Sequence, residues 1–146
     1  MSGFTDSMER YVLDFVTGRV TPRYTTSRTV YLGLLTADPV STDPSFASLT
    51  EVVATGYARK AVTWAAPTTD ANSVSTISNS VAIQFGPFTG VAGLPTCTWG
   101  FLSTSASGTA GDVVDLMQFS VPLSAPQNET AQADIGSVVL NLFSTS

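Results

Sequence analysis

Few residues in this chain have side chains that can do chemistry. The 146 residues include no histidine and one cysteine, Cys97. Histidine is the commonest general base, nucleophile activator and metal ligand, so Ser-His-Asp catalysis, Cys-His catalysis and histidine-containing zinc sites are excluded. Cys97 lies in the apolar run CTWGFL, which predicts a buried and unreactive thiol rather than a nucleophile.

Carboxylates are the remaining candidates for catalysis or metal binding. Asp112 and Asp115 are three residues apart, an offset that points two side chains to opposite faces of a strand and makes a poor acid–base pair. Asp38 and Asp43 share a turn-rich loop that lacks the spacing of a calcium-binding loop, and aspartate commonly caps its own backbone in turns. The glycines show no phosphate-binding pattern. We therefore predict no enzyme activity, no metal site and no cofactor.

Two of the six basic residues, Arg59 and Lys60, are adjacent in the run ATGYARKAVTW. Residues 57–66 have the composition of a β-strand, on which neighbouring side chains point to opposite faces. If the face that carries Trp64 packs on the core, Lys60 lies near the edge of that face with its amine directed outward. Arg59 then lies beside Tyr57 on the other face, where it is expected to pair with an acid across a strand or a subunit boundary. Tyr57 and Arg59 are therefore candidate partner-contact residues.

The elements that would position these residues are mostly short strands. Alternating or apolar runs separated by turn residues predict six to eight strands, and no helical pattern lies between them. This pattern is typical of an all-β, antiparallel β-sandwich of the jelly-roll kind. Five aromatic residues are expected to fill its core: Trp64, Phe85, Trp99, Phe101 and Phe119. The expected strands cover residues 29–36, 57–66, 80–86, 96–105 and 113–126, with one or two more in 133–143, while residues 37–48, 67–75 and 86–95 are expected to be loops.

A short α-helix is predicted over residues 6–17. The apolar residues Met8, Tyr11, Val12, Phe15 and Val16 recur at helical spacing and line one face. Asp6 and Glu9 have the spacing of a capping box, and Gly18 is placed to end the helix. So short a helix needs a partner surface, which can be the core of its own domain or a neighbouring subunit.

The segment after this helix is a polar arm, RVTPRYTTSR, at residues 19–28. The arm carries Arg19, Arg23 and Arg28, so residues 1–36 have a net charge of +1 whereas the rest of the chain has −6. Arginine forms bidentate pairs with carboxylates, so these three residues are candidate contacts with acidic groups of a partner; the alternative is a solvated arm. We expect residues 1–28 to be a docking element and residues 29–146 to be one β-sandwich domain.

The composition excludes other classes of protein. A net charge of −5 argues against nucleic acid as a partner. No run approaches the roughly 20 apolar residues of a membrane span, and the N-terminus has no apolar secretory segment, so synthesis in a cytoplasm is expected. Charged residues make up only 12%, as in a subunit that buries much of its surface in an assembly.

Several short motifs occur in a characteristic order along the whole chain. They are YVLDFVTG, TVYLGLLTADP, EVVATGYARKAVTW, ISNSVAIQF, CTWGFLSTSASG, VVDLMQFSVPLSAPQNETA and VVLNL. In this order the motifs resemble the small tail-fibre or minor-tail-protein family of tailed bacteriophages. The Gly/Pro-rich connector 86–95 and the closing strands depart from the family pattern. The resemblance implies a non-enzymatic virion protein with a β-sandwich fold, assembled as symmetric copies, with a homotrimer as the expected form.

The resemblance leaves the position on the virion open. A small domain without a shaft or a collagen-like repeat cannot by itself form a long fibre. We therefore expect an exterior decoration or cement protein that binds the major capsid protein. The alternative is a tail fibre or minor tail protein that binds other tail proteins. A role in host recognition would use the loops at 37–50, 67–76 and 86–95.

Overall fold

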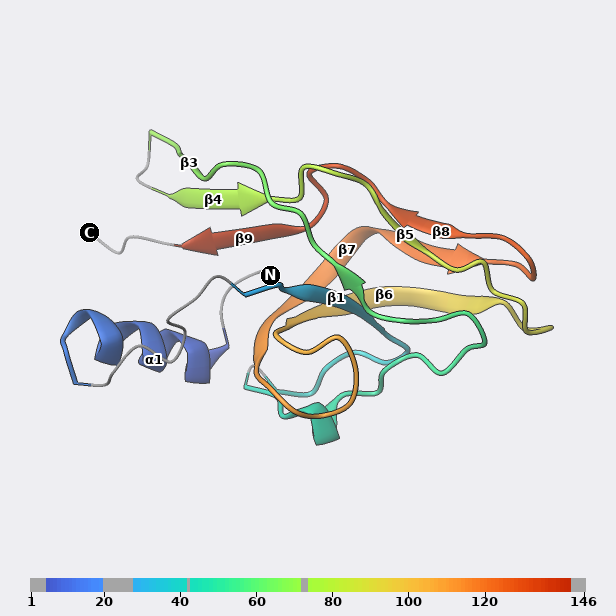
Figure 1. Ribbon diagram of the computed structural model, residues 1–146, viewed down its shortest axis with the longest axis horizontal. Coiled ribbons are helices and arrows are strands. Elements are labelled where there is room, and N and C mark those ends of the chain that lie inside the picture. Colours follow the sequence, from blue (N-terminus) through green and yellow to red (C-terminus); the bar gives the residue numbers. More distant parts are fainter. Residues whose placement is uncertain (1–4, 20–27, 42, 72–73, 143–146) are drawn as a thin grey trace.

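The computed structural model describes residues 5–19, 28–41, 43–71 and 74–142. These residues form one α-helix and antiparallel strands arranged as a sandwich, as predicted (Figure 1). No helix among the described residues is long and apolar enough to cross a membrane.

The larger sheet has the strand order β2-β1-β6-β7. These strands are β2 (Lys60–Ala61), β1 (Tyr31–Leu35), β6 (Leu94–Ser103) and β7 (Val113–Ala125). β1 lies inside the sheet, and its four residues after Tyr31 are buried, because both faces of this strand are covered. The strand predicted over residues 29–36 is thus confirmed, and its nearly continuous apolar run fits a strand that is covered on both faces.

The second layer is a two-stranded ribbon with one additional strand. β5 (Ile83–Phe85) pairs with β8 (Ala131–Ala133), and β4 (Ser75–Ser78) pairs with β9 (Val139–Leu142). β4 leads into β5, and β8 leads into β9, so the two pairs form one long ribbon that is interrupted at Asn79. β3 (Thr68–Thr69) is added on the outer side of β4.

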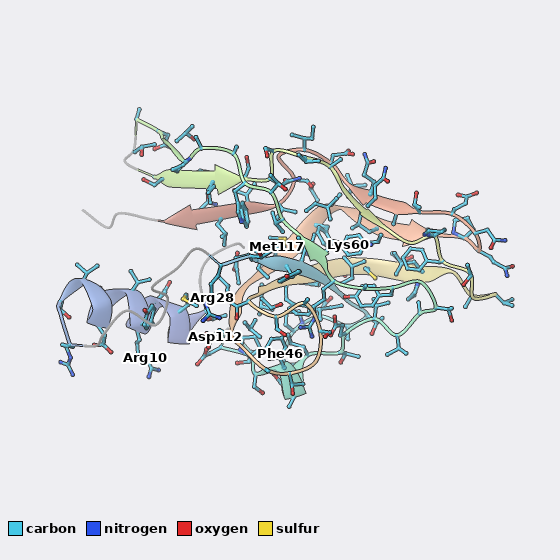
Figure 2. The ribbon with its side chains drawn as sticks, in the orientation of Figure 1. Arg10, Arg28, Phe46, Lys60, Asp112 and Met117 are labelled. Carbon is cyan, nitrogen blue, oxygen red and sulfur yellow. The ribbon has the colours of Figure 1, made fainter. Side chains whose placement is uncertain are left out.

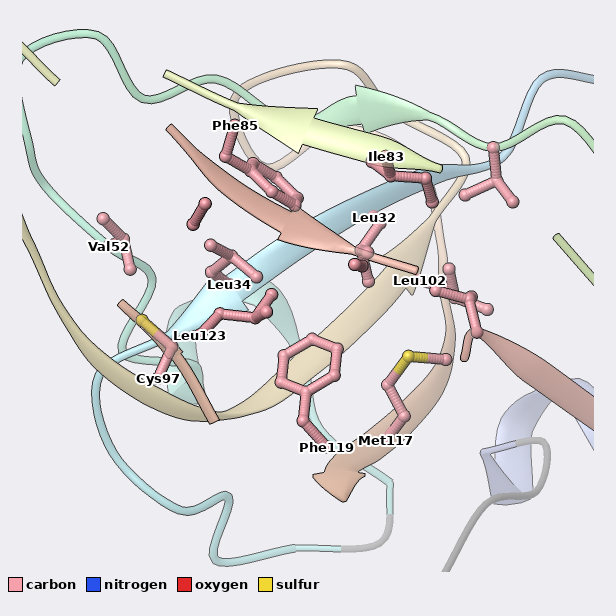
Figure 3. Packing of buried hydrophobic residues seen from close by; sticks show 14 of the residues in the cluster. Leu32, Leu34, Val52, Ile83, Phe85, Cys97, Leu102, Met117, Phe119 and Leu123 are labelled. Carbon is pink, nitrogen blue, oxygen red and sulfur yellow. The ribbon is translucent and has the colours of Figure 1, made fainter. Parts of the chain in front are cut away.

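The main core lies between the two layers (Figure 3). It contains Leu32 and Leu34 from β1, Phe85 from β5, and Phe119 from β7. Three of the five aromatic residues expected inside are buried, whereas Trp64, beside this core, and Trp99, beside the smaller cluster that contains Phe101, are only half-buried.

Cys97 is fully buried in this core, which confirms the expected unreactive environment. Its thiol donates to the carbonyl oxygen of Pro95 at 3.3 Å. Burial in apolar surroundings raises the pKa of the Cys97 thiol to about 11, because the thiolate would lose its hydration.

A second, smaller apolar layer covers the outer face of the larger sheet. Here the segment around the 3₁₀ turn η1 (Phe46–Ser48) folds under the sheet, so that Phe46 meets the ring of Phe101 edge-on. The ring of Phe101 lies directly over Gly33 of the paired strand, where a Cβ atom would collide with it. Close approach of this kind is possible only for glycine.

The structure corrects two strand predictions. Within 57–66 only Lys60 and Ala61 form a strand, because the chain leaves β1 and crosses to the other layer, where the amide of Ala65 donates to the carbonyl of Ser78. The predicted loop 67–75 contains β3 and the start of β4, whose threonine and serine side chains made the segment resemble a loop.

The helix α1 spans Asp6–Val16, close to the predicted 6–17. The expected capping box at Asp6 is wrong: Thr5 is the N-cap, and its Oγ1 lies 3.4 Å from the amide nitrogen of Met8. Thr5 is held in this position because its own amide donates to the carbonyl of Val114 in β7. Gly18 ends the helix with φ +72°, and the amide of Arg19 donates to the carbonyl of Asp14, as in a Schellman motif.

Candidate partner-contact site

Arg59 is buried in the layer beneath the larger sheet, and its guanidinium group holds three segments together. Its Nε and Nη2 donate to the two carboxylate oxygens of Glu51 at 2.8 and 2.7 Å. Nη1 and Nη2 also donate to the carbonyls of Ser105 and Gly108 at 3.0 and 2.8 Å. The Arg59 side chain is only 4% exposed. A bidentate pair of this kind is both strong and specific in geometry.

Aromatic rings complete the surroundings of Arg59. The guanidinium carbon lies 4.9 Å from the ring centre of Phe46 and 5.0 Å from that of Phe101. Cations over aromatic faces are attracted by the ring quadrupole, more strongly where water is excluded. Arg59 therefore fixes the positions of the 37–50 loop and the 104–112 turn against the sheet.

Tyr57 takes part in the same cluster. Its hydroxyl donates to Glu51 Oε1 at 2.8 Å and accepts the amide of Leu34 at 2.9 Å. Burial, together with the negative charge of Glu51, raises the pKa of the Tyr57 hydroxyl well above its usual range. The phenol therefore stays neutral and can act as a donor at any ordinary pH.

The acid expected to pair with Arg59 is thus Glu51 of the same chain. The sequence could not identify this residue, because Glu51 reaches the sheet through an isolated bridge to Leu35 rather than through a regular strand. The guanidinium group makes these four hydrogen bonds within its own chain. A contact of Arg59 or Tyr57 with a partner stays a prediction.

The N-terminal arginines lie in a different environment. Arg19 is 77% exposed and pairs with Asp14 one turn before it, with 3.2 Å between Nε and Oδ1. Arg28 is also exposed, and it precedes β1. Arg23 lies outside the described residues. Figure 2 places Arg10 on the helix and Arg28 near its base, so cationic side chains gather at the helix end of the molecule.

One surface of α1 was missed by the sequence prediction. Met8 is buried in the core and Tyr11 packs against it, so the first half of α1 is anchored there. The side chain of Phe15, expected on the same face, lies outside the part that the structure describes. Further along, Leu13 and Val16 are 65% and 75% exposed. Val16 was expected on the packed face and Leu13 was not assigned to any face. The prediction for Val16 is wrong, because it assumed one apolar face along the whole helix.

The three loops considered for host recognition do not come together. Figure 1 shows the 86–95 segment at one end of the molecule, whereas the β3–β4 hairpin lies at the other end beside β9. The 37–50 segment folds beneath the larger sheet. Among the described residues, these loops therefore offer no common surface.

Two pockets lie on the described part of the molecule. A pocket of about 460 Å³ lies at the base of α1, and one of about 120 Å³ lies between β7 and β8. The larger one includes Asp43 and Asp112, which already take part in interactions within the chain. The described part of the chain contains no cluster of three or more potential metal ligands.

Comparison with known proteins identifies a family for this chain. No curated protein matches the chain. A family model described as podophage GP4 fiber I protein gp80 matches residues 3–141, which is nearly the whole sequence and includes α1 and every strand except the last residue of β9. The chain therefore belongs to the phage structural family of the podophage GP4 fiber I protein gp80.

Proposed function

We propose that this chain is a structural, non-enzymatic component of a podophage tail fibre. The family match over residues 3–141 is the observation that carries this proposal. It supports the fibre alternative better than the capsid decoration that we first expected from the size of the domain. A fibre can be assembled from several small proteins, so the absence of a shaft from this chain does not oppose the role.

The position on the particle is tested by imaging. Antibody raised against the purified protein, coupled to gold, should label intact virions at the tail in electron micrographs. Labelling over the whole head would overturn the fibre role and restore capsid decoration. If virions carry no label and mass spectra of purified particles do not contain the protein, then it is not a virion component.

We further propose that the arm contacts acidic groups of a neighbouring virion protein through Arg19, Arg23 and Arg28. Support comes from the exposed positions of Arg19 and Arg28 and from the net charge of +1 in residues 1–36. A deletion of residues 1–28 is a poor test, because Thr5 and Met8 belong to the packed structure. Charge reversal of the three arginines to glutamate leaves these anchors in place.

The charge-reversed protein should be lost from purified particles while its unfolding midpoint stays within error of the wild type. Lys60→Glu is the matched control, since it reverses a basic residue outside the arm. Normal incorporation of the triple variant would contradict the arginine contact without affecting the fibre role.

Copies of the chain are expected to assemble, with three as the predicted number. Low charge content supports an assembled state, as do eight large apolar side chains among the described residues that are more than half exposed. Light scattering of the purified full chain measures the number directly. A stable monomer at all accessible concentrations would remove this part of the proposal.

A further inference from the structure

The outer half of α1 carries an exposed strip that no other described part of the chain covers. Arg10, Leu13 and Val16 follow one another at intervals of three residues, so they lie along one side of the helix. All three are exposed, with Leu13 at 65% and Val16 at 75%. An apolar strip with one cation at its end is unusual on a helix that already buries Met8 on another side.

A second surface of the molecule has the complementary chemistry. The pocket between β7 and β8 is floored by the buried Phe119, Leu123 and Ala133. Its rim includes Val121, which is 71% exposed, and the exposed carboxylate of Asp134. Its volume of about 120 Å³ equals roughly four water molecules at about 30 Å³ each, which suits one branched aliphatic side chain.

The charges of the two surfaces match as well. Arg19 and Arg59 form ion pairs within the chain, whereas Arg10 and Asp134 form none among the described residues. Asp134 Oδ1 accepts one hydrogen bond, from Gln132, which orients the carboxylate without neutralising it. An unpaired cation and an unpaired anion thus stand beside the exposed apolar groups of the two surfaces.

The strip cannot reach the pocket of its own chain. Thr5 fixes the start of α1 to Val113 and Val114, at the beginning of β7. Val121 lies seven residues further along this strand, roughly 24 Å away at about 3.4 Å per residue. Figure 1 shows that α1 extends away from the sheets while β7 and β8 lie on the opposite side of the anchor. Two copies are therefore required to bring the surfaces together.

We infer that the strip of α1 docks in the β7–β8 pocket of a second copy of this chain. Leu13 enters the pocket, Val16 packs on the rim beside Val121, and Arg10 pairs with Asp134. The contact joins two different surfaces, so it propagates from copy to copy and closes into a ring when the rotation permits. The inference rests on the proposed assembly of copies and names the contact that builds it.

The experiment compares variants of the full chain by sedimentation velocity over a range of concentrations. Leu13→Asp and Val121→Asp should each shift the protein to monomer, with at least a tenfold weaker association. Val91→Asp is the matched control, because Val91 is 88% exposed and lies on neither surface. Circular dichroism should stay unchanged in all three, since every substituted side chain is exposed, and their unfolding midpoints should agree with that of the wild type at dilutions where all samples are monomeric.

Charge exchange tests the pairing itself. Arg10→Asp and Asp134→Arg should each weaken association two- to fivefold, and the double variant should recover wild-type association because the pair is restored in the opposite sense. If the loss of association in the double variant equals the sum of the losses in the two single variants, the docking is wrong while assembly stands. The same conclusion follows if Leu13→Asp associates like the wild type. If the wild-type chain is monomeric, the assembly proposal fails together with it, and the virion location remains a separate result.

Discussion

At the scale of single residues, the adjacent Arg59 and Lys60 have different roles. Arg59 is buried and binds Glu51, Ser105 and Gly108, whereas Lys60 is half-exposed at the start of β2. The sequence predicted this difference from the two faces of a strand. It could not predict that the partner acid lies in the same chain, because the loop that carries Glu51 has no regular pattern.

Arg59→Ala should therefore destabilise the protein much more than Lys60→Ala. Removing one member of a buried pair costs roughly 3–5 kcal/mol, and we expect about 3 kcal/mol because the Glu51 side chain is 28% exposed and can regain water. Lys60→Ala should change the free energy of unfolding by less than about 0.5 kcal/mol. Urea unfolding measures both. Arg59→Lys should restore little, since lysine cannot make the bidentate pair, and equal effects of the two alanine variants would refute the role given to Arg59.

Gly33 provides a second test at this scale. Gly33→Ala places a methyl group against the ring of Phe101, and through it against Arg59, so the expected loss is roughly 1–3 kcal/mol from overpacking. Gly90→Ala is the matched control, because its Cβ would lie 3.4 Å from the Thr55 hydroxyl and needs only a small adjustment. Thermal unfolding of the two variants should differ clearly; identical midpoints would show that the sheet tolerates the extra methyl group.

At the scale of elements, the apolar strands were predictable and the polar ones were not. The strands β1, β5, β6 and β7 were located within a few residues, because the pattern of apolar side chains in the sequence shows which positions are buried. β3 and β4 were missed since their threonine and serine residues pair through hydroxyl groups, as between Thr69 and Ser75. The length of the strand predicted over 57–66 was overestimated, because composition cannot reveal where the chain passes from one layer to the other.

The interruption of the β4–β5/β8–β9 ribbon depends on Asn79, which is 1% exposed. Its Nδ2 donates to the carbonyls of Val81 and Asp134, and its Oδ1 accepts the amide of Val138, all at 2.9 Å. Asn79→Ala leaves these buried groups without partners, so we expect a loss of about 2–4 kcal/mol. Hydrogen exchange should show faster opening of β4 and β9 in particular.

Asn141→Ala is the matched control for this prediction. Asn141 is half-buried in β9 and makes one side-chain bond, from the hydroxyl of Thr76 to its Oδ1. Its removal should cost no more than about 1 kcal/mol. If Asn79→Ala exchanges no faster than this control, the ribbon is held by its strands alone.

At the scale of the whole molecule, stability should depend on alkaline pH. Unfolding exposes Cys97 and Tyr57, whose folded pKa values are both raised, so the unfolded chain releases protons first. The contribution of these two groups to the free energy of unfolding is therefore fully present below the ordinary thiol pKa, and it falls as the pH rises toward 11. The fall is about 1.4 kcal/mol per pH unit for each group that is ionised only in the unfolded chain.

The measurement is the urea midpoint between pH 8 and pH 11. Cys97→Ala should flatten the decline over the lower part of this range, and Tyr57→Phe over the upper part, even though each variant is less stable at pH 8. A wild-type midpoint that does not change with pH would contradict the buried states of both groups.

The two ends of the molecule differ in construction, which the sequence did not predict. α1 and β9 lie at one end, while the 86–95 segment forms the other end (Figure 1). The net charges of +1 and −6 in the two parts of the sequence do not follow this division in space, because β9 and Asp112, at the base of α1, belong to the acidic part. The exposed strip of α1 was not foreseen, because a one-face description of the helix hides a second face.

Among the described side chains, Thr5 and Met8 anchor the first turn of α1 to the sandwich. The 11 residues of this helix form a rod about 16 Å long at 1.5 Å per residue, clamped at Thr5 and Met8. A tilt of about 20° at Thr5 would move the other end of α1, at Val16, by roughly 5–6 Å without breaking a hydrogen bond between strands. A partner bound at that end of α1 can therefore shift by the same distance while the strands keep their pairing.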